Sequence, residues 1–143
     1  YNIEIKSTPA TDNKYHPEPA GFADLLYQLI VDKGIASRTI IQSFDPRPLR
    51  YLRDKQPKVR LALLVENVKS PDWNIRRLGF SPDIYSPYFR LIGKRRVSKL
   101  QAQGIKVIPW TVNETSDMQQ MMDYGVDGII TDYPDRLLKL LSR

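Results

Sequence analysis

The chain has 143 residues, enough for one domain that buries a hydrophobic core. Hydrophobic residues make up 41% and charged residues 27%, which is ordinary for a globular protein and argues against a disordered chain. There is no cysteine, which excludes disulfides, thiol nucleophiles and thiolate metal sites, and the formal net charge of +6 is compatible with anionic partners.

Strand patterns and amphipathic helix patterns alternate along the chain, starting at residue 2. The predicted strands are residues 2–6, 38–44, 59–66, 83–87, 105–113 and 126–132. The predicted helices are residues 22–34, 45–57, 72–79, 88–103, 116–124 and the leucine-rich segment after residue 134. Several strands are near-continuous apolar runs, as expected when helices cover a parallel sheet. The class is therefore α/β, and periodicity alone allows either an open doubly wound sheet or part of a barrel.

No apolar run approaches the roughly 20 residues of a membrane helix, so we expect no transmembrane segment. The densest basic cluster lies in residues 93–106. Its cations stand beside apolar residues, as on the solvated outer face of a helix, and we expect no nucleic-acid partner. These cations are Lys94, Arg95, Arg96 and Lys99.

Polar side chains gather at the carboxyl ends of the predicted strands, where parallel α/β folds bind their ligands. Glu4 and Lys6 are two residues apart and therefore point to the same side of the first strand, opposite Ile3 and Ile5. Here a carboxylate can bind a divalent cation and an ammonium can hold a phosphate oxygen. The alternative is a half-exposed strand with a solvated ion pair.

Two aromatic residues are candidates for a pocket wall, and both are also compatible with core packing. Trp110 lies near the end of the fifth predicted strand, and Phe44 ends the second. His16, the only histidine, falls in the long first loop, where we expect a surface residue because the sequence gives it no partner.

Two further patterns predict structural roles. Ser116 and Gln119 have the spacing of a capping box. Asp127 and Asp132 flank the last strand, but five residues apart they face opposite sides, so separate structural roles are expected, with Asp132 as a helix cap. No glycine-rich phosphate loop, zinc motif or Ser/His/Asp set is present, and we assign no catalytic residue.

Four segments read together resemble the glycerophosphodiester phosphodiesterase family: "NIEIK", "IIQSFD", "VIPWTVN" and "GVDGIITDYPDRL". The resemblance covers essentially the whole chain and implies a TIM barrel. Since such barrels have eight strands, residues 1–143 would form a single partial TIM (β/α)8 barrel domain with about six of eight β/α units. The two catalytic histidines of the family belong to leading motifs that this sequence does not contain.

The resemblance assigns roles to four residues. Glu4 matches a metal-ligating glutamate, Lys6 a lysine near the substrate phosphate, Trp110 the pocket tryptophan, and Phe44 a position on the pocket side. It implies a divalent cofactor, Mg²⁺ or Ca²⁺, and hydrolysis of a glycerophosphodiester substrate to glycerol 3-phosphate and an alcohol.

We therefore expect a carboxy-terminal fragment that is inactive alone, with a missing N-terminal segment or a partner chain covering the open barrel. Two alternatives stay open. One is a non-catalytic binding module that keeps the phosphate-ligand pocket. The other is a barrel enzyme using Lys6 for a Schiff base, which the neighbouring Glu4 disfavours because a carboxylate keeps the amine protonated.

Overall fold

Five parallel strands form one sheet in the order β1-β2-β3-β4-β5 in the computed structural model, which describes residues 1–142. The strands are β1 (Asn2–Glu4), β2 (Ile40–Ser43), β3 (Arg60–Val65), β4 (Ile84–Pro87) and β5 (Lys106–Val107). Each strand pairs with the next one along the chain. The order never reverses, whereas a doubly wound sheet has a reversal point, so the winding is that of a barrel wall.

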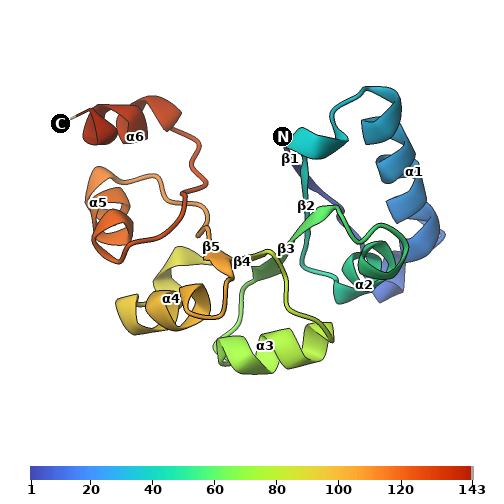
Figure 1. The fold of residues 1–143 in the computed structure, drawn as a ribbon, viewed down its shortest axis with the longest axis horizontal. Coiled ribbons are helices and arrows are strands. Elements are labelled where there is room, and N and C mark those ends of the chain that lie inside the picture. Colours follow the sequence, from blue (N-terminus) through green and yellow to red (C-terminus); the bar gives the residue numbers. More distant parts are fainter. Residues whose placement is uncertain (143) are drawn as a thin grey trace.

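Helices cover the outer side of this sheet. They are α1 (Pro19–Asp32), α2 (Pro46–Lys55), α3 (Pro71–Leu78), α4 (Lys94–Gln101), α5 (Thr115–Asp123) and α6 (Pro134–Leu141), with short 3-10 turns η1 (Pro9–Thr11), η2 (Ala36–Arg38) and η3 (Phe89–Leu91). Figure 1 shows the helices as an arc around the strands that is open between α6 and α1. A proline stands in the first turn of α1, α2, α3 and α6, where its missing N–H is not needed.

The hydrophobic core lies between the strands and the helices. Ile5, Ile41 and Leu61 face it from the sheet side, and Leu49 and Leu52 from α2; all five are at most 1% exposed. Five of the six residues of β3 are buried, as the apolar run predicts for a central strand. The predicted fold class is therefore confirmed: the chain is α/β with a parallel sheet.

Two predicted elements are shorter than expected. The helix predicted at residues 88–103 is divided into η3 and α4, because the backbone is extended at Ile92 and Gly93. The strand predicted at residues 105–113 has only two residues in β5, and beyond it Trp110 makes an isolated bridge with Tyr88. Pro109, which has no N–H to donate, lies between the two.

The sixth predicted strand is an extended segment, not a strand, in the described structure. The N–H of Asp127 donates to the Val107 carbonyl at 2.9 Å, and the N–H of Ile130 donates to the Pro109 carbonyl at 2.9 Å. The segment therefore runs beside β5, and five strands, not six, form the sheet.

Two predicted helix caps are wrong. The N-cap residue of α5 is Glu114, and its side chain makes no capping bond; Gln119 instead donates to Asp123 at 3.0 Å. The N-cap residue of α6 is Tyr133, and the Asp132 carboxylate instead accepts a hydrogen bond from Asn113 Nδ2 at 2.9 Å. Within residues 1–142 no helix is both long and apolar enough to cross a membrane.

Candidate functional site

A cavity of about 250 Å³ lies at the carboxyl ends of the strands. It is lined by Glu4, Lys6, Gln42, Phe44, Leu64, Trp110, Thr111 and Ile130. These residues come from β1, β2 and β3, from the chain after β5 and from the extended segment beside it. The four residues singled out in the sequence, Glu4, Lys6, Phe44 and Trp110, thus lie around one cavity.

Glu4 and Lys6 face this cavity as a pair. Lys6 Nζ lies 3.4 Å from Glu4 Oε2; the Glu4 side chain is 21% exposed and the Lys6 side chain 79%. Ile5 between them points the opposite way into the core. The backbone at Ile5 is fixed on both sides, because its N–H donates to the Gln42 carbonyl at 2.9 Å and its carbonyl accepts from Ser43 Oγ at 2.7 Å. The pair is therefore held on a rigid strand end.

Trp110 forms the aromatic wall of the cavity. Its Nε1–H donates to the backbone carbonyl of Ser86 at 2.8 Å, which fixes the ring plane. Phe44 meets the indole edge to face at a centroid distance of 5.3 Å, and Tyr88 lies 5.6 Å away on a tilted plane. The wall is therefore preorganised by one hydrogen bond and two ring contacts.

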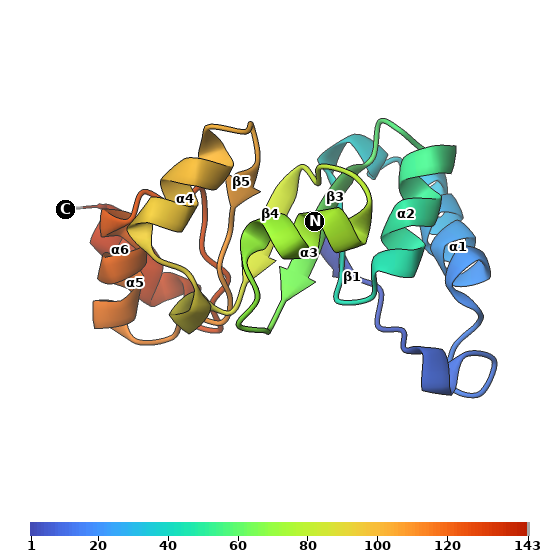
Figure 2. The same cartoon turned by 90° about the horizontal axis from the view of Figure 1, so that it is seen from below.

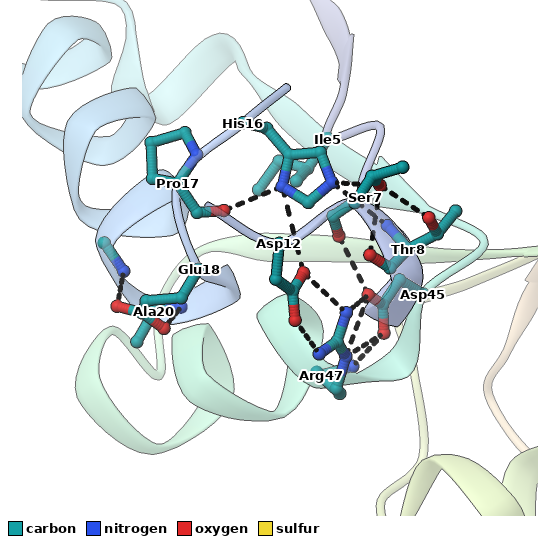
Figure 3. Close-up of polar contacts among 12 residues, drawn as sticks. Ile5, Ser7, Thr8, Asp12, His16, Pro17, Glu18, Ala20, Asp45 and Arg47 are labelled. Carbon is teal, nitrogen blue, oxygen red and sulfur yellow. Dashed lines mark hydrogen bonds and ion pairs between the residues drawn. The ribbon is translucent and has the colours of Figure 1, made fainter. Parts of the chain in front are cut away.

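A charged cluster holds the loop of residues 7–18, which follows the cavity pair in sequence; Figure 2 shows this loop, with η1, projecting from the body of the fold. Arg47 is its centre: its guanidinium binds Asp12 at 2.5 Å and Asp45 at 2.7 Å (Figure 3). Ser7 Oγ donates to Asp45 Oδ2 at 2.9 Å. Asp45 also caps α2 by accepting from the Arg47 N–H.

These contacts move three ionisation equilibria. The hydrogen bond from Arg47 holds the pKa of Asp12 below its usual value. Burial acts to raise the pKa of Asp45, but the hydrogen bonds from Arg47 and Ser7 outweigh it and the pKa is lowered. Hydrogen bonds to Asp45 and Asp12 raise the pKa of Arg47. Asp12, Asp45 and Arg47 are therefore all charged at neutral pH, and their ion pairs hold the loop of residues 7–18.

His16 is half-buried within the same loop, and its side chain is 9% exposed, so the expectation of a surface residue without a partner is wrong for its side chain. Nε2 accepts from the Thr8 N–H at 3.3 Å and contacts Thr11 Oγ1 at 2.8 Å, while Nδ1 donates to the Pro17 carbonyl at 2.7 Å (Figure 3). The ring stacks on Phe22 at 5.9 Å. Both ring nitrogens are thus occupied within the loop, and the residue closes the loop structurally.

The described residues do not build a complete site for a divalent cation. Residues 1–142 contain no group of three or more His, Cys, Asp or Glu side chains placed to hold a metal. Mg²⁺ and Ca²⁺ prefer several oxygen ligands, and Glu4 is the one carboxylate among the cavity-lining residues. This part of the chain can therefore offer one carboxylate ligand to a cation.

Some cavity residues were not identified from the sequence. Gln42 lies two residues before Phe44 on the same strand side, and its Oε1 accepts from Asn2 Nδ2 at 2.9 Å. The period-two pattern that placed Glu4 beside Lys6 also applies to Gln42 and Phe44, and could have identified it. Thr111 and Ile130 gave no comparable pattern, because their place depends on the irregular chain after β5.

The chain is similar to known proteins over nearly all of its length. The Glycerophosphoryl diester phosphodiesterase family matches residues 1–136. A glycerophosphodiester phosphodiesterase of Caldanaerobacter subterraneus subsp. tengcongensis is 32% identical over 99% of this chain and 55% of that protein. The chain thus spans about half the length of the curated relatives it matches.

Solved structures are also similar to this chain over nearly all of its length. A crystal structure from Silicibacter pomeroyi DSS-3, assigned as a glycerophosphoryl diester phosphodiesterase, has a TM-score of 0.84 at 28% identity and covers 98% of this chain and 49% of that one. An Oleispira antarctica phosphodiesterase, solved in complex with the product sn-glycerol-3-phosphate, has a TM-score of 0.80 at 16% identity over 99% of this chain and 55% of that one, and shows the fold alone. The chain belongs to the glycerophosphoryl diester phosphodiesterase family.

Proposed function

We propose that this chain is the carboxy-terminal part of a metal-dependent glycerophosphodiester phosphodiesterase with a TIM-barrel fold. Such an enzyme hydrolyses a glycerophosphodiester to glycerol 3-phosphate and an alcohol. The observation that carries the proposal is the cavity at the carboxyl ends of the strands, around which Glu4, Lys6, Phe44 and Trp110 all lie. Family membership over residues 1–136 and the 32% identical glycerophosphodiester phosphodiesterase support it.

The residues have distinct roles in this proposal. Lys6, whose side chain is mostly exposed beside the cavity, binds a phosphate oxygen of the substrate. Glu4 would supply one carboxylate ligand to Mg²⁺ or Ca²⁺, and its Oε2 lies 3.4 Å from Lys6 Nζ. Trp110 and Phe44 form an apolar wall against the glycerol carbons.

Among the described residues that line the cavity, Glu4 and Lys6 are the ones able to transfer a proton, and this proposal assigns both to binding. Cleavage of a phosphodiester needs a general acid or base within hydrogen-bond reach of the reacting oxygens. His16, the only histidine of the sequence, has both nitrogens engaged in its own loop. We therefore propose that the 143 residues alone bind product but do not turn over substrate, and that a further polypeptide segment completes the barrel.

The test is titration of sn-glycerol 3-phosphate into the purified chain, with and without Mg²⁺ or Ca²⁺, by calorimetry and by the indole resonance of Trp110. The expected result is binding that Lys6→Met weakens about tenfold, since a charge-assisted hydrogen bond of roughly 1.5 kcal/mol is lost. Lys14→Met, which removes an exposed ammonium of the 7–18 loop, is the matched control.

Two results would contradict the proposal. One is no binding by a chain whose circular dichroism shows the fold. The other is equal weakening by both lysine variants, which would indicate general attraction of anions. Turnover of glycerophosphocholine by the 143 residues that a chelator abolishes would refute the assignment of inactivity.

A further inference from the structure

The excess positive charge of the chain is concentrated in residues 69–103. The sequence has 22 Lys and Arg against 16 Asp and Glu. Eight of these cations and two of the acids, Asp72 and Asp83, lie in this segment, which gives it the whole net charge of +6. All eight basic residues are exposed; they are Lys69, Arg76, Arg77, Arg90, Lys94, Arg95, Arg96 and Lys99.

These residues gather around α3 and α4, which lie next to each other on the outer side of the arc, away from its opening (Figure 1). The ion pair of Lys99 Nζ with Asp72 Oδ2 at 2.5 Å joins the two helices. A cavity of about 240 Å³ lies between them, lined by the first turn of α3 and by Arg95, Arg96 and Lys99. Within residues 1–142 only Lys99 among the eight cations forms an ion pair.

Exposed apolar side chains lie among these charges. Trp73 on α3 is 38% exposed, and Val68, just before the helix, is 80% exposed. Lys69 Nζ and Arg77 Cζ lie 5.9 and 5.7 Å from the centre of the Trp73 ring. An indole flanked by cations is typical of proteins that bind at the membrane–water interface. Val68 favours lipid over nucleic acid, because an aliphatic side chain neither pairs with phosphate nor stacks on a base.

We propose that this surface, the α3–α4 basic patch, binds membranes that contain anionic phospholipid. The cations attract the lipid phosphates, and Trp73 and Val68 enter the headgroup region. Because α3 follows β3 and α4 follows β4, the residues that begin the two helices lie toward the carboxyl edge of the sheet. The inference does not depend on catalytic activity of the chain.

The test is co-sedimentation of the protein with vesicles of phosphatidylcholine alone and of phosphatidylcholine mixed with phosphatidylglycerol. Binding is expected only to the mixed vesicles and is expected to fall as salt is raised. Each basic residue at an anionic surface contributes about fivefold to affinity, so Arg95→Gln, Arg96→Gln and Lys99→Gln together are expected to weaken binding by roughly 100-fold. Lys33→Gln, Lys55→Gln and Lys58→Gln, a triple variant with the same charge change at exposed sites outside the patch, is the control.

Tryptophan fluorescence gives an independent measurement. Vesicle binding is expected to shift the emission to shorter wavelength, and Trp73→Phe is expected to abolish the shift while Trp110 still emits. Equal losses of affinity in the two triple variants would overturn the proposal, as would equal binding to both vesicle types. Absence of vesicle binding, with tight binding of single-stranded RNA that the patch variant loses, would assign the surface to nucleic acid instead.

Discussion

The guanidinium of Arg47 binds the carboxylate of Asp12 at 2.5 Å across 35 residues of sequence. The same guanidinium binds Asp45, which Ser7 also contacts, so the loop of residues 7–18 is tied to the start of α2 at two points. Ser7 directly follows Lys6, and the tie therefore fixes the chain next to the proposed phosphate-binding residue.

The stability of the protein is expected to fall in acid because of this cluster. The pKa values of Asp12 and Asp45 are lower in the folded chain than in the unfolded chain. Their contribution to the free energy of unfolding is therefore complete above about pH 4 and is lost as the pH falls through the folded-state values. Urea denaturation at a series of pH values measures this loss.

Arg47→Gln is expected to reduce that pH dependence and to lower stability at pH 7 by about 2 kcal/mol, because Asp45 is left buried without its charged partner. Arg60→Gln is the control, since Arg60 is exposed and donates to the Ser37 carbonyl, not to a carboxylate. An Arg47→Gln variant with the wild-type acid transition would show that the cluster does not control the pH dependence.

His16 is expected to order the loop of residues 7–18 without taking part in chemistry. His16→Ala removes contacts to Thr8, Thr11 and the Pro17 carbonyl, and amide hydrogen exchange across residues 8–17 is expected to speed up at least tenfold. Tyr15→Ala removes the neighbouring side chain, which is 87% exposed, and is expected to leave the exchange unchanged. Equal exchange rates in the two variants would contradict the role of His16.

The sequence predicted the elements whose patterns are local. The apolar run of β3 and the prolines opening α2 and α6 depend on neighbouring residues, and the structure confirms these elements. The break at Gly93 was missed because the apolar spacing continues through it: Phe89 is buried in η3, and Ile92 is buried in the extended connection that follows. Hydrogen bonds of Asp132 and Gln119 with other side chains replaced the predicted caps.

The candidate site was predictable where its residues share a strand face. Glu4 and Lys6 follow the period of two, and the strand ends of a parallel sheet meet at one edge. Trp110 and Phe44 were assigned through the family resemblance, and the structure brings their rings to 5.3 Å. The Arg47 cluster could not be predicted, since it joins residues 35 and 38 positions apart through an irregular loop.

The two rings of the cavity wall are expected to differ in their effect on stability. Trp110→Phe removes the indole donor to the Ser86 carbonyl and is expected to lower the free energy of unfolding by about 1–2 kcal/mol. Phe44→Ala removes an exposed ring and one edge contact, and a loss of about 0.5–1 kcal/mol is expected. Urea denaturation of both variants measures the difference, and a larger loss for Phe44→Ala would contradict this order.

Two aspartates repeat one structural role at the amino-terminal edge of the sheet. Asp83 precedes β4 and accepts from the first buried N–H of β3, at Leu61, at 2.8 Å and from Arg53 at 2.6 Å. Asp127 precedes the extended segment beside β5 and accepts from the Val107 N–H at 2.8 Å and from Gln101 at 2.9 Å. In each case one carboxylate accepts from a backbone N–H of a strand and from a side chain of the helix that precedes that strand: α2 before β3 for Asp83, and α4 before β5 for Asp127.

This repetition predicts unequal losses on truncation. Asp127→Ala is expected to lower the free energy of unfolding by about 1 kcal/mol, because the partners that lose an acceptor are neutral. Asp83→Ala is expected to lower it by about 2 kcal/mol, because Arg53 loses its carboxylate partner. The buried Nε of Arg53 already lacks a partner within residues 1–142. Asp123→Ala, at an exposed carboxylate that accepts from Gln119 within its own helix, is the control. If Asp127→Ala were as stable in urea as Asp123→Ala, the hydrogen bond from the Val107 N–H to the Asp127 carboxylate would not hold residues 126–132 against β5. Backbone hydrogen bonds alone would then account for the position of this segment.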